Sequence, residues 1–243
     1  MRYLITFSYD GSKFNGYQKQ PNTKTVQQEI ENALKKINSN NEVKIYASGR
    51  TDALVHAYNQ KAHFDLNINI SPERLKKSLN SLINDYIYIK SVEEVSSDFH
   101  ARFSVKSKEY MYIINMGEYN PIEKDYVYQY NKNLDTKAIN EAIKYFIGKH
   151  DFRAFTKVEL EKDFVRTIID AKVKLEDSKI IISFIGTGFL RYQVRNMVGL
   201  LIEVGSHKKN VEDVVKILEL RNRTNYTLTA KGCGLYLVDV LYK

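Results

Sequence analysis

Residues 43–57 of the chain read VKIYASGRTDALVHA. Apolar residues alternate in the first part, at Val43, Ile45 and Ala47, and this period of two predicts a strand. Gly49 follows, and because glycine adopts backbone shapes that a Cβ forbids, it predicts a tight turn. The stretch therefore predicts a strand that ends in a turn and presents the polar residues after it.

Two charged residues lie in this turn. Arg50 and Asp52 are two apart, so in an extended chain both side chains point to the same side. A cation beside a carboxylate favours its ionised form, and an ionised carboxylate can act as a nucleophile. On the spacing alone, a surface Arg-Asp turn is the simpler interpretation.

The composition indicates a folded, basic protein. Of 243 residues, 43% are hydrophobic and 12% aromatic, and the net charge is +8. A basic balance favours a polyanionic partner, nucleic acid before an anionic membrane surface, although a biased genome would also enrich Lys, Asn and Ile. The lone Cys233 excludes an intrachain disulfide and fits a reducing compartment. No apolar run has membrane-spanning length, and the first residues resemble a strand rather than a signal peptide. We expect a soluble, cytoplasmic protein without a membrane partner.

Several kinds of catalytic site lack their motifs. The five histidines show no short paired spacing, and one cysteine cannot complete a thiolate metal site. There is no P-loop, no GxGxxG and no nucleophile elbow. We therefore expect chemistry from side chains alone, with no cofactor and no metal.

The element order predicts an α+β fold with two halves, residues 1–103 and 104–243. Each half is expected to follow the β-α-β-β-α-β order of a ferredoxin-like unit. Their antiparallel or mixed sheets would lie side by side around a central catalytic cleft that Asp52 faces. The first half is predicted to have strands at 3–8, 43–48, 60–66 and 87–95, and helices at 26–37 and from Ser71-Pro72 onward. The second is predicted to have strands at 110–116, 164–175, 180–185 and 235–242, and helices at 135–147, 190–204 and 211–220.

The whole turn resembles a known catalytic loop. GRTDALVHA, residues 49–57, closely resembles GRTDAGVHA of the tRNA pseudouridine synthase A family. Five further blocks resemble that family's motifs in the same order along the chain. They are YDG (9–11) with GYQKQP (16–21) and TVQ (25–27), HARFS (100–104) with KEY (108–110), GKHDF (148–152), GFL (188–190) with VRNMVG (194–199), and GLYL (234–237).

The resemblance implies a cofactor-free isomerase that converts uridine to pseudouridine in the anticodon stem-loop of tRNA, at positions 38–40. It implies Asp52 as the nucleophile, which attacks the sugar, attacks the ring or deprotonates the sugar. It also implies a homodimer. Ribosomal RNA as the substrate fits the same residues. An RNA-binding or chaperone protein without catalysis is the alternative of another class, and loss of Asp52 would have favoured it.

Two further residues are implied as catalytic. Tyr110 matches the tyrosine that lies against the target uracil, and its alternative is a tyrosine in the core of a strand. Arg195 matches the arginine that pairs with the catalytic carboxylate. Arg191 and Arg195 are four apart and share a helix face, which is usually solvated.

Other residues are candidates for substrate binding. The planar guanidinium of Arg50 would fill the gap left by the flipped base, or simply pair with Asp52. His56 would orient the loop or contact phosphate, or more simply serve as a hydrogen-bonded structural histidine. Leu235 would lie beneath the uracil or pack in the core. Basic side chains for the RNA backbone are expected at Lys13, Lys19, Lys61, Arg102, Lys106, Lys108 and Arg153.

Three positions depart from the family pattern. Leu54 replaces a glycine, and if that glycine has a positive φ, leucine is strained there. Tyr17 stands where the family usually has tryptophan, and Lys231 falls within a typical Ala-Pro pair.

Overall fold

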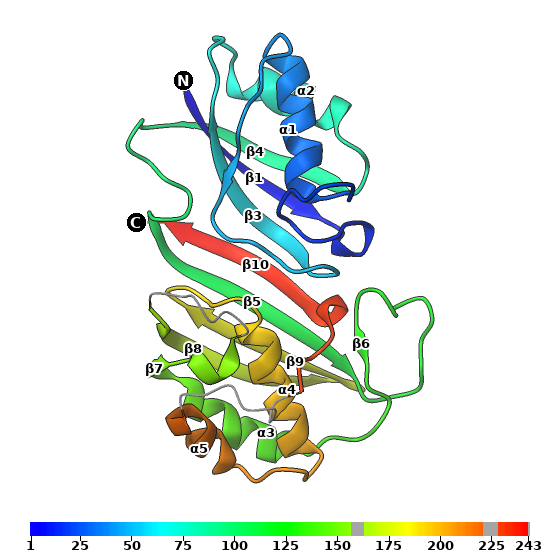
Figure 1. Cartoon of the computed structure of the whole chain (residues 1–243). Coiled ribbons are helices and arrows are strands. Elements are labelled where there is room, and N and C mark those ends of the chain that lie inside the picture. The colour runs from blue at the N-terminus through cyan, green and yellow to red at the C-terminus, as the bar shows by residue number, and fades with distance from the viewer. Residues whose placement is uncertain (157–162, 221–227, 243) are drawn as a thin grey trace. The chain divides into compact units, whose positions relative to one another are not determined.

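The computed structural model describes residues 1–156, 163–220 and 228–242 (Figure 1). The chain divides into two compact units. The first unit comprises Met1–Lys106 and Tyr236–Lys243, and the second unit comprises Ser107–Leu235. No helix among the described residues is long and apolar enough to cross a membrane.

The first unit is a mixed sheet with two helices. Its strand order is β4-β1-β3-β10, and β2 pairs with β3. β10 runs parallel to β3, with Tyr236 opposite His56, whereas β1 is antiparallel to both β3 and β4. Its elements are β1 (Arg2–Tyr9), α1 (Val26–Ile37), β2 (Tyr46–Ala47), β3 (His56–Asp65), α2 (Pro72–Leu82), β4 (Ile87–Val95) and β10 (Leu235–Tyr242), with a 3-10 turn at Gly11–Lys13.

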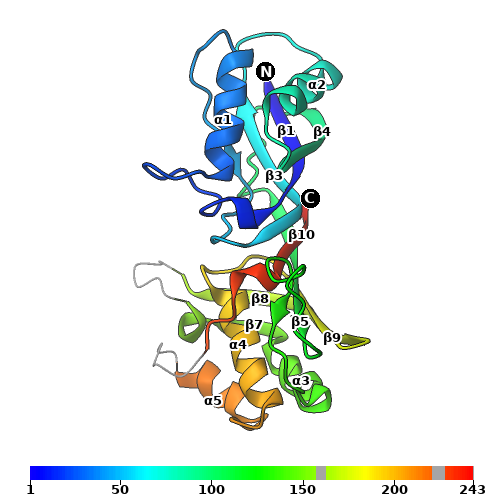
Figure 2. The ribbon, with the colours of Figure 1, turned by 90° about the vertical axis from the view of Figure 1, so that its right-hand side faces the viewer.

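Alternating apolar residues build the core of this unit. Tyr3, Ile5 and Phe7 of β1 are fully buried, because a period of two places them on one face of the strand. α1 runs along the sheet in Figures 1 and 2. α2 begins as expected, with Ser71 accepting a hydrogen bond from the amide of Arg74.

One predicted strand is much shorter than expected. The interval 43–48 was predicted as a strand, but only Tyr46–Ala47 pairs with β3. Val43 and Ile45 are buried at 5% and 3% exposure. The amide of Ile45 donates to the Glu31 carboxylate of α1 rather than to a strand. The apolar alternation at 43–47 therefore reflects burial of these side chains in the core, and only two residues of the interval pair with β3.

The second unit is also a mixed sheet with helices. Its strand order is β5-β9-β8-β7, and β6 pairs in parallel with β5. α3 and α4 contact each other, as both ribbon views show. The elements are β5 (Val105–Asn115), β6 (Tyr128–Gln129), α3 (Thr136–Ala142), β7 (Gly148–Asp151), β8 (Val165–Glu176), β9 (Lys179–Gly186), α4 (Gln193–Gly205) and α5 (Asp213–Leu220), with 3-10 turns at Ile143–Phe146, Arg153–Phe155 and Gly232–Gly234.

The fold is α+β, as predicted, and the second half follows the predicted element order, β5-α3-β8-β9-α4-β10, with β6, β7 and α5 in addition. β10, expected to close the second half, pairs with β3 of the first unit. β7 was not predicted, and it pairs with β8. The helix predicted over 135–147 ends at Ala142 and continues as a 3-10 turn to Phe146.

Candidate active site

Asp52 lies in a loop between β2 and β3, formed by residues 48–55 and named here the Asp52 loop. Asp52 is half-buried, whereas Arg50 is exposed and Thr51 is buried at 8% exposure. The amide of Val55 donates to the Asp52 carbonyl at 3.3 Å, which closes a four-residue turn. Leu54, at the third position of this turn, has φ +68°. A positive φ there is typical of a type II turn, in which glycine is preferred. The expected strain at Leu54 is therefore present.

A buried glutamine supports the start of the Asp52 loop. Gln60 of β3 is fully buried. Its Oε1 accepts a hydrogen bond from Ser48 Oγ at 2.6 Å, and its Nε2 donates to the Gly49 carbonyl at 3.0 Å. A buried amide that loses its hydrogen-bond partners is costly. The oxygen and the nitrogen of the Gln60 amide therefore both favour the loop conformation that keeps Ser48 and Gly49 in place.

The segment after β1 contacts the middle of the Asp52 loop. The Tyr9 hydroxyl lies 2.8 Å from Thr51 Oγ1, and the Tyr17 amide donates to the Thr51 carbonyl at 3.1 Å. Gly16 has φ +86°, and a Cβ at this residue would lie 3.0 Å from the Thr51 carbonyl oxygen. Glycine is therefore required at position 16 both for its φ and for the close approach.

His56 follows the Asp52 loop and contacts two other parts of the first unit, β10 and the segment after β1. Its ring is 3% exposed and stacks on Tyr236 at a centroid distance of 4.8 Å. Nδ1 accepts the amide hydrogen of Gly11 at 3.1 Å and lies 3.4 Å from the Asp10 carboxylate. Because Nδ1 accepts, its proton is on Nε2 in the neutral ring. These contacts bury the ring between β10 and the segment that follows β1.

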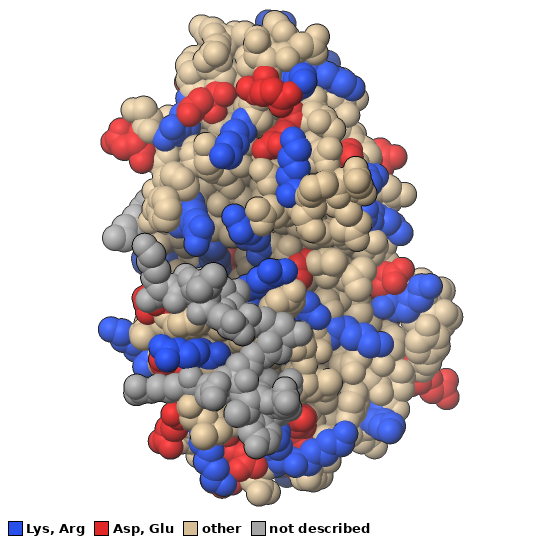
Figure 3. Space-filling view, viewed as in Figure 1, with Lys and Arg blue, Asp and Glu red and all other residues tan. Residues whose placement is uncertain are grey.

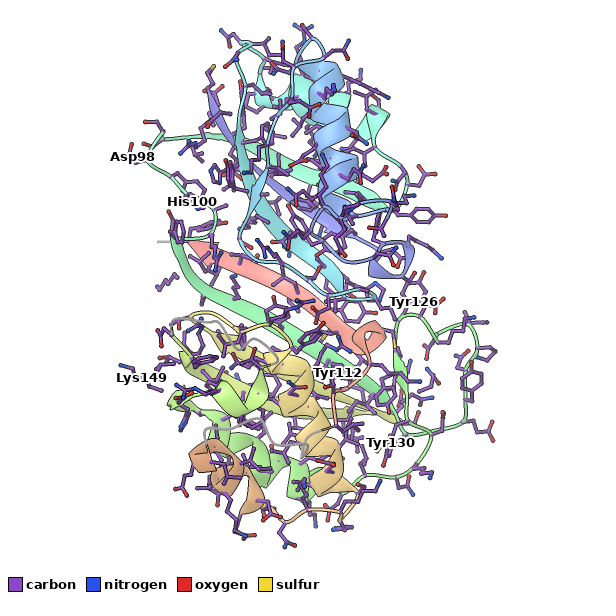
Figure 4. All side chains as sticks on the ribbon, in the orientation of Figure 1. Asp98, His100, Tyr112, Tyr126, Tyr130 and Lys149 are labelled. Atoms are coloured by element: carbon purple, nitrogen blue, oxygen red, sulfur yellow. The ribbon has the colours of Figure 1, made fainter. Side chains whose placement is uncertain are left out.

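Tyr110 lies on β5 in the second unit. It is 8% exposed and stands opposite Phe184 of β9. The Phe189 ring meets it edge to face at a centroid distance of 5.1 Å, an arrangement that aromatic pairs prefer. Tyr112, labelled in Figure 4, lies two residues along β5. Its hydroxyl donates a hydrogen bond to the Lys231 carbonyl at 2.7 Å. Burial raises the pKa of Tyr112 well above its usual value.

Arg195 lies in the first turn of α4 and is half-buried. Its Nε donates to the Ala230 carbonyl at 2.7 Å, and the Ala230 amide donates to the Arg195 carbonyl at 3.0 Å. The guanidinium also lies 5.4 Å from the Tyr192 ring centroid. A cation in the first turn of a helix is unfavourable for the helix dipole, so Arg195 does not serve the helix itself.

The remaining candidates have ordinary surface or core positions. Lys106 is exposed, Lys108 is half-buried, and Leu235 is buried at the start of β10. Lys and Arg side chains are spread over the face seen in Figure 3, with Asp and Glu among them. Within the described residues, no three His, Cys, Asp or Glu side chains are placed to hold a metal ion.

The sequence reasoning missed the residues that support the Asp52 loop, namely Tyr9, Thr51 and Gln60. One signal was available for Gln60. Gln60, Ala62 and Phe64 alternate along β3 and are all buried. A polar side chain in such a series indicates a buried hydrogen-bonding role.

Comparison with known proteins identifies the family of the chain. The family model described as tRNA pseudouridine synthase matches residues 5–104 and 142–243. A tRNA pseudouridine synthase A of Anoxybacillus flavithermus is 46% identical, with 99% of this chain and 98% of that protein covered. Proteins of the same name from Streptococcus agalactiae and Limosilactobacillus reuteri are 44% and 42% identical, covering at least 99% of this chain and 95% and 96% of their own lengths. A crystal structure of a Cbf5-Nop10-Gar1 complex aligns with 81% of this chain and 46% of its own, at TM-score 0.36 and 14% identity, too low to compare side chains. The chain belongs to the tRNA pseudouridine synthase family and is an isomerase.

Proposed function

We propose that this enzyme isomerises uridine to pseudouridine in the anticodon stem-loop of tRNA, at positions 38–40, with Asp52 as its nucleophile. The observation that carries the proposal is the setting of Asp52. A half-buried carboxylate lies in a loop whose Gly49 and Thr51 carbonyls accept hydrogen bonds from Gln60 and Tyr17, within the segment that resembles the family's catalytic loop. Such support is what a reacting group needs to keep its position.

The reaction needs one carboxylate and no other reactant. The bond between N1 of uracil and C1′ of ribose breaks, and a bond between C5 and C1′ forms. C5 loses its proton and N1 gains one, so atoms and charge balance. Water must be kept from C1′ because it would turn isomerisation into hydrolysis.

We assign Tyr110 and Arg195 the two other catalytic roles. Tyr110 presents an aromatic ring for stacking on the flipped uracil, and its edge-to-face contact with Phe189 supports this role because the contact favours one orientation of the ring. Arg195 supplies the counter-charge of Asp52. The hydrogen bond from its Nε to the Ala230 carbonyl supports this role because it restricts the orientations of the guanidinium. Arg50, Lys106, Lys108, Leu235 and His56 serve substrate binding in the same proposal, His56 through the shape of the loop.

The decisive assay is tritium release from tRNA labelled with 5-³H-uridine, because C5 loses its hydrogen. Asp52→Asn keeps the shape of the side chain but removes its charge, so release should fall to background while tRNA affinity is retained. Asp98→Asn, an exposed carboxyl in the same unit, is the matched control and should release tritium at the wild-type rate. Release by Asp52→Asn at the wild-type rate would show that the mechanism is wrong.

Substrate choice is tested separately. Pseudouridine should be mapped in tRNA and ribosomal RNA from cells with and without the gene. We expect loss at tRNA positions 38–40 only, and loss confined to ribosomal RNA would refute the anticodon assignment. We further propose a cytoplasmic homodimer, because a tRNA is large relative to one chain. Sedimentation of the enzyme at a monomer's mass would refute the dimer and leave the chemistry unaffected.

A further inference from the structure

We propose that Tyr9 is a positioning residue for this reaction, and that its hydrogen bond to Thr51 fixes the backbone from which Asp52 projects. The inference rests on the proposed role of Asp52. Tyr9 is the last residue of β1, 43 positions before Asp52, and the family resemblance assigns it no role in the reaction.

The contact lies directly beside the reacting residue. Tyr9 is 5% exposed and Thr51 is 8% exposed, and their hydroxyl oxygens are 2.8 Å apart. The Thr51 carbonyl accepts the Tyr17 amide hydrogen at 3.1 Å. Thr51 is thus bound through both its side chain and its main chain to the segment that continues from β1.

The hydroxyl of Tyr9 is suited to a permanent bond. Burial raises the pKa of Tyr9 to about 12, and this effect is larger than the opposite effect of its hydrogen bonds with Thr51 and Gln60. The phenol therefore stays protonated at every pH at which the enzyme would work. Through Gln60, the same hydroxyl is linked to the bonds that hold Ser48 and Gly49.

These bonds restrict what Asp52 can do. Thr51 is fixed on one side of Asp52, and the turn that Val55 closes is fixed on the other. The carboxylate then has only its own side-chain torsions left to explore. Displacement of a reacting group by 1 Å can cost about 100-fold in rate. Loss of the Tyr9 bond should therefore slow chemistry more than it weakens tRNA binding.

The chain offers a matched control on the same strand. Tyr3 is also on β1 and fully buried, and its hydroxyl donates to the Ile70 carbonyl at 2.8 Å, far from the Asp52 loop. Tyr9→Phe and Tyr3→Phe each remove one hydrogen-bonded hydroxyl from a buried tyrosine, so they should cost similar stability. We expect Tyr9→Phe to lower kcat for tritium release by about 10- to 100-fold with KM for tRNA unchanged. Tyr3→Phe should keep the wild-type kcat, and equal kcat for the two variants would overturn the proposal.

Substitution of Thr51 tests the same bond from its other end, and it keeps the test valid even if Tyr9→Phe fails to fold. Thr51→Val keeps the shape without the hydroxyl and should lose kcat as Tyr9→Phe does. Thr51→Ser keeps the hydroxyl and should retain most of the activity. The double variant, Tyr9→Phe with Thr51→Val, should be no slower than the slower single variant, because both substitutions break the same hydrogen bond between Tyr9 and Thr51. Rate losses that multiply would show that the two hydroxyls act separately. An active Asp52→Asn would instead refute the proposed function.

Discussion

Leu54 offers a test of backbone strain beside the nucleophile. Its φ of +68° is in the left-handed region, which costs an L-residue with a Cβ roughly 1–2 kcal/mol. Its side chain is 42% exposed, so truncation also removes some buried area. Leu54→Ala loses that burial but keeps the strain, whereas Leu54→Gly loses the burial and relieves the strain. The difference between these two variants therefore isolates the backbone term.

The sign of that difference is unusual. At an ordinary position, glycine is about 0.5–1 kcal/mol less stable than alanine, because the unfolded chain gains freedom. At position 54, relief of strain exceeds this cost, so Leu54→Gly should be more stable than Leu54→Ala by about 0.5–1 kcal/mol. In a chain of this size that difference corresponds to about 1–4 °C in melting temperature.

Thermal unfolding followed by circular dichroism measures the effect. The matched control is Ala53→Gly, at the exposed neighbouring residue that is not in the left-handed region. Ala53→Gly should lower the melting temperature. At position 54 the same exchange of alanine for glycine, the difference between Leu54→Ala and Leu54→Gly, should raise it. If glycine lowered stability at both positions, the strain argument would be refuted.

Burial, titration and charge lead to the other predictions. Tyr17 is 3% exposed, and its hydroxyl has no hydrogen-bond partner among the described residues, so Tyr17→Phe should raise the free energy of unfolding by about 1 kcal/mol in urea titrations; a fall would contradict this. Burial beside His100 lowers the pKa of His63 to about 4 from 6.5, so the folded state favours its neutral form. Stability should therefore fall as pH drops from about 6.5 to 4, and His63→Gln should flatten that slope in the same titrations. Affinity for tRNA should fall steeply with salt, and Lys106→Ala or Lys108→Ala should reduce the log–log slope by roughly 0.7–0.9 without changing which uridine is modified.

Local patterns predicted most elements of the fold. The helix at 26–37 and the strands at 87–95 and 235–242 have the predicted bounds, because their apolar periods are long and regular. β7 was missed because Gly148–Asp151 contains no apolar alternation. The partner of β10 was also missed, since parallel pairing between distant segments leaves no local trace.

The candidate site was predictable to a different degree. The resemblance identified the segment around Asp52, and the replacement of glycine by Leu54 correctly indicated a positive φ. The hydrogen-bond partners of Tyr9 and Gln60 could not be predicted, because they depend on which buried hydroxyl and amide meet in space. The roles of Asp52, Tyr110 and Arg195 in the reaction stay predictions until the variants are assayed.

The parallel pairing of β10 with β3 affects how the enzyme is made. His56 emerges from the ribosome about 180 residues before its stacking partner Tyr236. At about 5–20 residues per second, this interval lasts roughly 10–40 s. During that time the edge of β3 that β10 will occupy is unprotected in the nascent chain. The unit that carries Asp52 is therefore completed only after β10 has been synthesised, so chains that stall or are truncated before β10 should bind chaperones and lack activity.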